Sequence, residues 1–354
     1  IDSIVTRVTE PYISEITLEQ SKFREINTVS QPWQNFGEHL PLIATNSGIL
    51  RLTNFTGNLT ITHTKFHRLY SDIAMNYADI TSVRADLLSG TPIFITGQIG
   101  QVTMSHNEFH QTMGALASSI YINLANPLNP TTTSHISLTN NHFTNGHSLR
   151  SAVLINAGSV DVDVVISDCL FDGNMLSANS NLSYDSYDSG ALVVTLAASW
   201  VTSVEVVDSR FVKNYGVGSA SGAHVAAQRV NFVGCDFVEN GNMIYSLYGG
   251  SLFGEVVEGV DVAKSSGMVQ STVYVGTTYW LSFDDVEFRA NWVSRLLKAS
   301  VGIKLYWVLT SFVVKNCEFV DNLGQFPLGF SDEWGVENDG DVVMDTVDNI
   351  NWIP

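Results

Sequence analysis

The chain has 354 residues, and only 15% of them are charged, against ~25% in typical soluble domains. Its 17 basic and 35 acidic residues leave a net charge of −18. Such a field repels phosphate backbones and anionic lipid, so we expect no nucleic-acid partner. The longest apolar run, residues 191–201, is interrupted by Thr195 and Ser199. It is too short to cross a bilayer, so we expect no direct membrane insertion.

A short pattern centred on phenylalanine recurs nine times along the chain. Apolar residues lie seven and five positions before each phenylalanine, and the residue between them is polar except at Val165 and Val313. This alternation predicts a strand with one buried face and one solvated face. The repeated aromatics are Phe23, Phe66, Phe109, Phe143, Phe171, Phe211, Phe237, Phe288 and Phe319.

The spacing between these phenylalanines varies from 26 to 51 residues, and each interval also holds a small-residue step followed by an apolar run. Clear examples are Ser189–Val193 and Ser221–Val225. Propeller blades and leucine-rich repeats keep more regular periods. A parallel β-helix tolerates the variation, because its strands stack in register while loops of any length leave the corners. The sequence therefore predicts an all-β fold, a single parallel β-helix (solenoid) of about nine coils with irregular terminal caps.

Stacked coils would place equivalent side chains in columns at a spacing of ~4.8 Å. In the later units an asparagine follows the phenylalanine by three positions, and we expect these amides to bond the turn backbone and one another. The predicted structural ladder comprises Phe171, Phe211, Phe237, Phe288, Phe319, Asn174, Asn214, Asn240, Asn291 and Asn322.

The three cysteines, Cys169, Cys235 and Cys317, each lie two residues before a repeat phenylalanine. The units between them carry Ser209 and Val286 at that position, so no two adjacent units could form a disulfide. We therefore interpret the cysteines as small buried side chains in a stacked column.

The two ends of the chain differ from its middle. We assign residues 1–15 to an N-terminal cap or joining segment, 16–324 to the β-helix, and 325–354 to an acidic C-terminal cap or joining segment. Solenoid ends need covering, and a joining segment would promote self-association. The long insertion at about 255–276 holds either an extra coil or a protruding loop. The chain begins at Ile1, so we expect a processed form or a fragment of a longer protein.

Four histidines occupy two positions of the repeat. His63 and His106 lie three residues before a phenylalanine, and His67 and His110 lie one residue after it. In adjacent coils they would cluster on one edge, where two or three imidazoles could hold a transition metal. The competing interpretation is that histidine replaces asparagine at a polar bend and faces water, giving a pH-sensitive edge.

Other polar segments offer further candidates. Asp339 and Asp341 lie in an oxygen-rich run that suits Ca²⁺, although the EF-hand pattern is absent and a solvated acidic loop is the simpler interpretation. The loop 184–188 combines tyrosines with carboxylates and suits glycan or protein contact. Sequons at Asn54, Asn58 and Asn181 would carry glycan in a eukaryotic secretory route. We expect Trp280, Trp292 and Trp307 to pack against the wall of the solenoid.

Carbohydrate lyases and hydrolases of the pectin-lyase-like fold are the main enzymatic alternative. Their chemistry needs several carboxylates close together with a basic residue near the sugar. The galacturonase signatures Asn-Thr-Asp, Gly-His-Gly and Arg-Ile-Lys do not occur. The nearest acidic pair, Asp284-Asp285, falls at a predicted strand bend and is interpreted as structural. We therefore assign no catalytic residue and no required cofactor.

The later units resemble a known repeat family. Gly190-Ala191-Leu192 followed by Phe211-Val212-Lys213-Asn214 is similar to the repeat pair of the chlamydial polymorphic outer membrane proteins. The resemblance covers about residues 16–322, although the four earliest units lack the asparagine. It implies a right-handed β-helix on the cell surface that acts as an adhesin.

The combined expectation is a secreted, extracellular or cell-surface protein without catalytic activity. It would serve as an adhesin or as the self-assembling subunit of a filament, appendage or coat, with a protein or glycan as surface ligand. A viral or phage spike is a further alternative.

Overall fold

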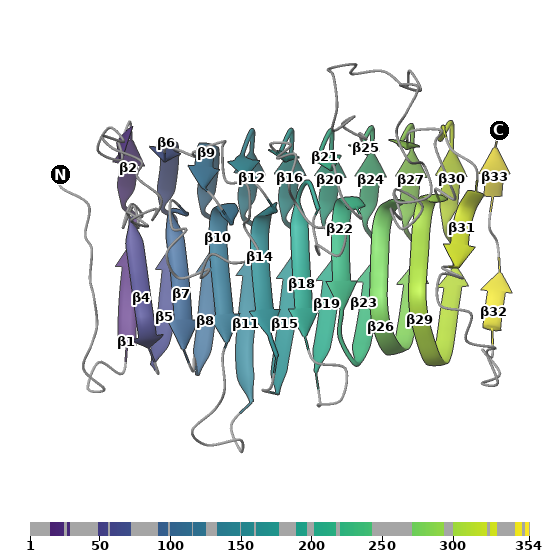
Figure 1. Cartoon of the computed structure of the whole chain (residues 1–354), viewed down its shortest axis with the longest axis horizontal. Coiled ribbons are helices and arrows are strands. Elements are labelled where there is room, and N and C mark those ends of the chain that lie inside the picture. The colour runs from purple at the N-terminus through teal and green to yellow at the C-terminus, as the bar shows by residue number, and fades with distance from the viewer. Residues whose placement is uncertain are drawn as a thin grey trace, which may run out of the picture.

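The computed structural model describes residues 15–24, 27–28, 49–55, 57–71, 91–97, 100–114, 116–124, 133–148, 150–158, 161–176, 189–196, 202–216, 220–242, 271–293, 300–323, 326–330, 344–348 and 351–353. Within these ranges the chain is all-β, and every strand pair is parallel. The predicted all-β class and parallel pairing are thus confirmed, in an arrangement compatible with a solenoid. Equivalent strands of successive units lie side by side along the long axis (Figure 1). The described ranges contain no helix that could cross a membrane.

The first strand of each unit carries the alternating pattern. In the strand of residues 162–167, Val162, Val164 and Ile166 are buried and the residues between them are partly exposed. Val164 lies in register with Ile136 of one neighbour and Val204 of the other. The first strands are β1 (Glu15–Glu19), β5 (Asn58–Thr62), β8 (Gln101–Ser105), β11 (Ser134–Thr139), β15 (Val162–Ser167), β19 (Ser203–Val207), β23 (Arg229–Val233), the C-terminal parts of β26 (Ser271–Asp284) and β29 (Ser300–Lys315), and β32 (Met344–Asp348).

The second strand of each unit is short and holds the phenylalanine. Each of these strands pairs with its equivalents so that the aromatic positions superpose. The second strands are β2 (Lys22–Arg24), the first parts of β6 (Lys65–Ser71) and β9 (Glu108–Gly114), β12 (His142–Thr144), β16 (Leu170–Asp172), β20 (Arg210–Val212), β24 (Asp236–Val238), β27 (Glu287–Arg289), β30 (Glu318–Val320) and β33 (Asn351–Ile353).

The third strands are only two residues long where they stand alone. These strands were not predicted, because two residues carry no periodicity. They are β3 (Asn27–Thr28), β13 (His147–Ser148), β17 (Met175–Leu176), β21 (Tyr215–Gly216), β25 (Gly241–Asn242) and β28 (Trp292–Val293), and the ends of β6 and β9 take the same role.

From β4 (Leu50–Phe55) to β22 (Ala220–Ala226) the fourth strands begin at or near the small-residue steps. The fourth strand of unit seven is continuous with the first strand of unit eight, as β26, and the fourth strand of unit eight is continuous with the first strand of unit nine, as β29. The fourth strands are β4 (Leu50–Phe55), β7 (Ile93–Gly97), β10 (Ala117–Leu124), β14 (Ser151–Ala157), β18 (Leu192–Leu196), β22 (Ala220–Ala226), the N-terminal parts of β26 and β29, and β31 (Phe326–Phe330).

The nine phenylalanines form one column, as predicted. Successive ring centroids are 4.5 to 5.4 Å apart, with interplanar angles of 2° to 20°. Such pairs add about 0.5–1.5 kcal/mol each beyond the apolar area they bury. The register continues past Phe319 to Trp352 of β33, a position that was not predicted because it holds tryptophan instead of phenylalanine.

Left-handed bends flank the short second strands. The residue three positions before the phenylalanine has positive φ in all nine units, and the residue two positions after it does so in units two to nine. Asn, Asp, His and Gly are the residues most readily found in this conformation. The first bend is filled by Gln20, His63, His106, Asn140, Asp168, Asp208, Gly234, Asp285 and Asn316.

The asparagine ladder lies directly after the second bend. The backbone N–H and the side-chain amide of Asn174 both donate to Oδ1 of Asn214, at 3.1 and 3.0 Å, and the same amide donates to the Phe143 carbonyl at 2.8 Å. Asn214, Asn240 and Asn291 repeat this pattern along the column as far as Asn322. Each buried side-chain amide thus hydrogen-bonds polar groups at the turns of neighbouring units.

A second, shorter ladder follows the first bend, in the mixed column of Cys, Ser, Thr and Asn residues; the column was predicted, but its hydrogen bonds were not. The side chain of Asn107 donates to Oδ1 of Asn141 at 2.9 Å and to the Ile61 carbonyl at 2.9 Å. The Thr64 N–H in turn donates to Oδ1 of Asn107. Only two units carry asparagine here, too few for the sequence alone to predict these bonds.

The three cysteines occupy this same column as buried, free thiols. Cys169 contacts the Leu138 carbonyl at 3.4 Å, and Cys235 contacts the Val206 carbonyl at 3.3 Å. Burial raises the thiol pKa to about 12 for both, and to about 11 for Cys317. They are therefore protonated and act as small packing groups.

Several predicted segments fall partly or wholly outside the described residues. Residues 1–14 and 255–270 lie outside them. Residues 271–276, the end of the long insertion, belong to β26. Within 325–354, the described strands β31, β32 and β33 pair with β29 and β30 and continue the stack.

Candidate functional site

The predicted histidine positions do come together on the surface of units two and three. His63 and His106 are exposed first-bend residues whose rings stack with centroids 4.8 Å apart and planes within 3°. Their conformation matches the Asp and Asn residues that fill the bend elsewhere. This geometry agrees with histidine replacing asparagine at a water-facing bend.

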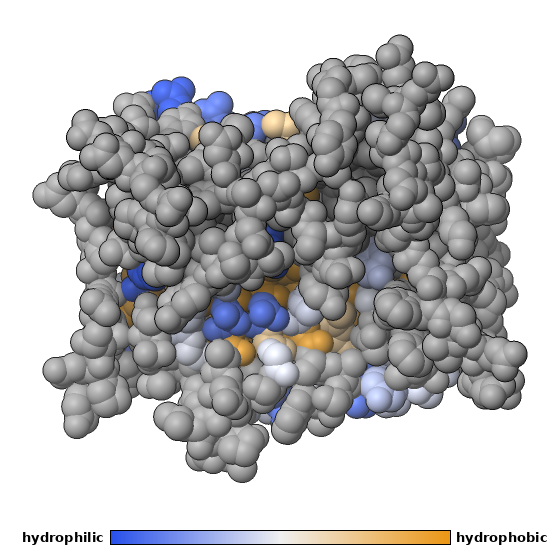
Figure 2. All heavy atoms as spheres, viewed as in Figure 1, coloured by the Kyte–Doolittle hydropathy of each residue, from blue (hydrophilic) through white to orange (hydrophobic). Residues whose placement is uncertain are grey.

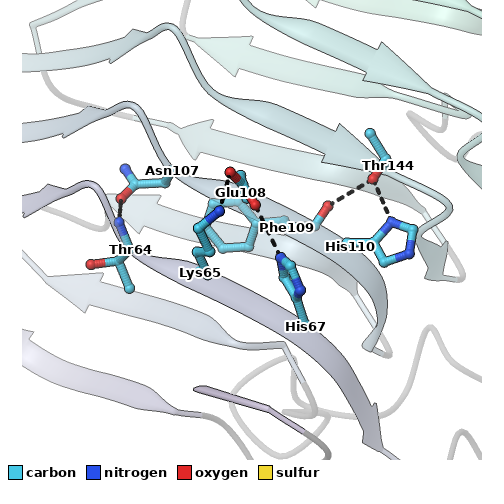
Figure 3. A network of polar contacts seen from close by, with 8 residues as sticks. All are labelled: Thr64, Lys65, His67, Asn107, Glu108, Phe109, His110 and Thr144. Atoms are coloured by element: carbon cyan, nitrogen blue, oxygen red, sulfur yellow. Dashed lines mark hydrogen bonds and ion pairs between the residues drawn. The ribbon is translucent and has the colours of Figure 1, made fainter. Parts of the chain in front are cut away.

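A cross-unit cluster, made of Lys65, His67, Glu108, His110 and Thr144, lies beside this pair. Figure 3 shows Lys65 and His67 both directed at the carboxylate of Glu108. Lys65 Nζ is 2.6 Å from one oxygen and His67 Nε2 is 3.2 Å from the other. His110 Nδ1 is 2.8 Å from the Thr144 hydroxyl of the next unit.

The electrostatics of the cluster follow from these contacts. The hydrogen bond from Lys65 lowers the pKa of Glu108. Partial burial lowers the pKa of His67, although the bond to Glu108 opposes this. At neutral pH the carboxylate is therefore charged and the imidazole neutral, which leaves His67 to donate its Nε2–H.

The cluster ties adjacent units together rather than assembling a metal centre. The His67 and His110 rings are 5.7 Å apart and nearly edge-on. Among the residues that the structure describes, no three His, Cys, Asp or Glu side chains are placed to hold a metal ion. Both oxygens of Glu108 already accept a hydrogen bond, so this carboxylate braces two units.

The residues of the other predicted sites belong to bends or strands of the fold, or lie outside the described residues. Asp285 is a first-bend residue, and Asp284 pairs with Lys315 of the next unit at 2.7 Å. Asn58 is exposed at the start of β5. Asn54 lies in β4. Asn181, Asp339, Asp341 and the loop 184–188 fall outside the described residues.

Of the predicted packing tryptophans, Trp280 lies on the surface and Trp292 packs against the neighbouring unit. Trp280 is 37% exposed, and the guanidinium of Arg229 lies 5.0 Å from its ring centroid. Trp292 is half-buried, its ring lies against Gly241 of the neighbouring strand β25, and its ring centroid is 6.3 Å from that of Tyr215 in β21, one strand further along. Trp307 belongs to β29, where its backbone pairs with Thr277.

An outward stripe on the fourth strands was not anticipated. Phe94, Tyr121, Leu154, Val193 and His224 follow one another in register and are all buried, although they point away from the main core. Hydrophobic and hydrophilic residues lie side by side on the part of the surface visible in Figure 2. Strands that are buried on both faces show no alternation of apolar and polar residues, so the sequence pattern did not predict this stripe.

No family model matches the chain, and comparisons with curated proteins and with solved structures likewise find no match. The function must therefore be argued from the geometry of the molecule itself.

Proposed function

We propose that the protein is a single right-handed parallel β-helix that acts as a non-catalytic extracellular scaffold. It would be an adhesin or the self-assembling subunit of a filament, appendage or coat. The observation that supports this most is the continuous parallel strand pairing from β1 to β33, in which each described unit contacts its neighbours along one axis. The polar clusters of the described surface brace units against each other, which suits a mechanical role.

Self-association would proceed through the two ends of the stack. In the described part of the chain, β1 pairs only with β5, and β33 pairs only with β30. A strand paired on one side presents a row of backbone donors and acceptors to another chain. Joining the end of one copy to the start of the next would give a heterologous, open filament.

The residues that would join two copies at β1 can be identified. Gln20 N–H donates to the Thr62 carbonyl at 3.0 Å. Because parallel pairing uses alternate residues of a strand, the backbone groups of Thr17 and Glu19 point to the opposite edge. Thr17→Pro would therefore remove an outward donor without breaking a bond to β5.

The test compares the native chain with Thr17→Pro and the matched control Thr17→Ala by sedimentation and negative-stain microscopy. We expect rods or fibres from the native chain and the alanine variant, and single particles from the proline variant. Removal of residues 325–354 should likewise stop polymerisation. A native chain that stays monomeric at high concentration, or equal polymerisation of both variants, would refute end-to-end assembly.

The same material distinguishes the alternatives. Turnover of uronic-acid or neutral glycans, with or without Ca²⁺, would indicate a lyase or hydrolase. A trimer in solution would indicate a spike. Either result would replace the scaffold proposal.

A further inference from the structure

The outer face of the first strands in units one to five carries an ordered set of hydroxyl groups. Two rows run across these strands, at the positions six and four residues before each phenylalanine. We define the hydroxyl face by Thr17, Thr60, Thr62, Thr103, Ser105, Ser137, Thr139 and Ser167. Thr17 is exposed, and the others are partly exposed.

Register fixes the spacing of this face. Thr60 lies beside Thr17 and Thr103, and Thr103 lies beside Ser137. Thr62 and Ser105 start the second row, which Thr139 and Ser167 extend. Neighbouring strands are ~4.8 Å apart, and two residues along a strand span about 6.6 Å. The hydroxyls therefore form a rectangular array (compare β5, β8, β11 and β15 in Figure 1).

Mutual hydrogen bonds hold several of these hydroxyls in place. Ser167 Oγ donates to Thr139 Oγ1 at 3.2 Å, and Ser137 Oγ lies 3.4 Å from the same oxygen. Gln101 donates its side-chain amide to Thr103 Oγ1 at 3.2 Å. The first contact joins two strands, the other two join residues i and i+2 of one strand, and all three restrict the side-chain rotamers. The array is thus set by the backbone ladder rather than by flexible side chains.

The face also differs electrostatically from the rest of this acidic chain. In units two to five, neither row contains a charged residue, and Val165 is the only member without a hydroxyl. The charged residues of the two rows, Glu19, Glu205, Asp284 and Lys315, lie at or beyond its borders. An uncharged array of groups that both donate and accept is complementary to a neutral lattice of donors and acceptors.

We infer that the hydroxyl face binds ordered water at the surface of ice. Hexagonal ice presents oxygen atoms in rectangular arrays whose two repeats are comparable to those of this face. The threonine hydroxyls would anchor first-shell waters, and the adjacent methyl groups would favour ordered water around them. Charged side chains would impose a different hydration geometry, and this face has none. The inference does not depend on end-to-end assembly.

The experiment uses ice itself as the probe, with size-fractionated monomer of the full chain. We expect the native protein to separate melting from freezing temperature in nanolitre osmometry and to slow ice recrystallisation. Thr103→Lys, at the centre of the face, should abolish both effects. Asn231→Lys is the matched control, because it adds the same charge to the same row three units away from Ser137, and it should retain both effects.

Folding is checked by circular dichroism, and a second variant, Thr103→Val, keeps the shape of the side chain while removing one hydroxyl. It should lose part of the activity. A native protein that behaves like an equal mass of an inert protein would overturn the inference. So would full activity in folded Thr103→Lys, or binding to neutral polysaccharide without any effect on ice.

Discussion

His224 shows how one buried side chain can set the acid sensitivity of the fold. It lies on the outward stripe of β22, 1% exposed, with its ring centroid 4.7 Å from that of Tyr274. Burial lowers its pKa to about 3, against about 6.5 in an unfolded chain. Between these values the unfolded state binds more protons. The contribution of neutral His224 to the unfolding free energy is therefore fully present above about pH 6.5, and it is lost as the pH drops toward 3.

We predict that His224→Leu makes the protein less sensitive to acid. In urea unfolding at pH 7 and pH 4, the loss of unfolding free energy at the lower pH should shrink by on the order of 3 kcal/mol in the variant. The same substitution at exposed His142 serves as the control and should leave the pH dependence nearly unchanged. An identical acid response in all three proteins would contradict the assignment.

Prediction from sequence worked at the residue level where a side chain recurs at a fixed offset. The phenylalanines and the later asparagines could be placed because several units repeat them. Asn107 and Asn141 form an equivalent ladder, but two asparagines in a mixed column were too few to predict its hydrogen bonds. The histidines were found by their shared positions, but their roles depend on Lys65 and Glu108, whose contacts only three-dimensional register reveals.

At the scale of the structural elements, the asparagine ladder connects the turns of successive units. Removing one member leaves three polar groups on two neighbouring residues without their partner. Asn214→Leu would leave the Phe171 carbonyl without its amide donor, and the Asn174 backbone and side-chain N–H groups without their acceptor. Each buried unsatisfied group costs about 1–3 kcal/mol.

We therefore predict that Asn214→Leu lowers the unfolding free energy by roughly 3–6 kcal/mol. Denaturant unfolding measures this, with Asn231→Leu as the matched control. Asn231 lies on the outer face of β23, where its oxygen accepts one bond from Ser282, so its loss should cost less than about 1 kcal/mol. Equal effects of the two substitutions would show that the ladder is not a major stabilising element.

How well a strand could be predicted depended on how regularly apolar and polar residues alternate in its sequence. The first strands alternate cleanly, and β15 occupies the residues expected of it. The fourth strands were located only by their small-residue steps, because β22 is buried on both faces and shows no alternation. The third strands are too short to have a period at all.

For the molecule as a whole, contacts between neighbouring units dominate. The position of a core substitution along the stack should therefore decide which units lose stability. Phe171 is fully buried between Phe143 and Phe211, whereas Phe23 is 8% exposed and stacks on Phe66. Phe-to-Ala substitution in a core costs about 3–5 kcal/mol. In a quasi-one-dimensional array this cost is felt mainly by adjacent units.

We predict that Phe171→Ala splits the unfolding transition, and that Phe23→Ala only loosens the first unit. Hydrogen exchange followed by mass spectrometry should show lost protection in β15, β16 and their neighbours for the first variant, and in β1 and β2 for the second. Uniform loss of protection across the chain in both variants would argue for one globally cooperative core.

Register is preserved across intervals of 26 to 51 residues, and this makes the length of the protein easy to alter in evolution. Deletion of the segment between two equivalent positions, such as Phe171 and Phe211, would remove one whole unit. The remaining units would still stack with equivalent residues next to each other. Duplication of such a segment would lengthen the body by one layer. Recombination between its own repeats could thus yield shorter and longer descendants without redesign of the interior.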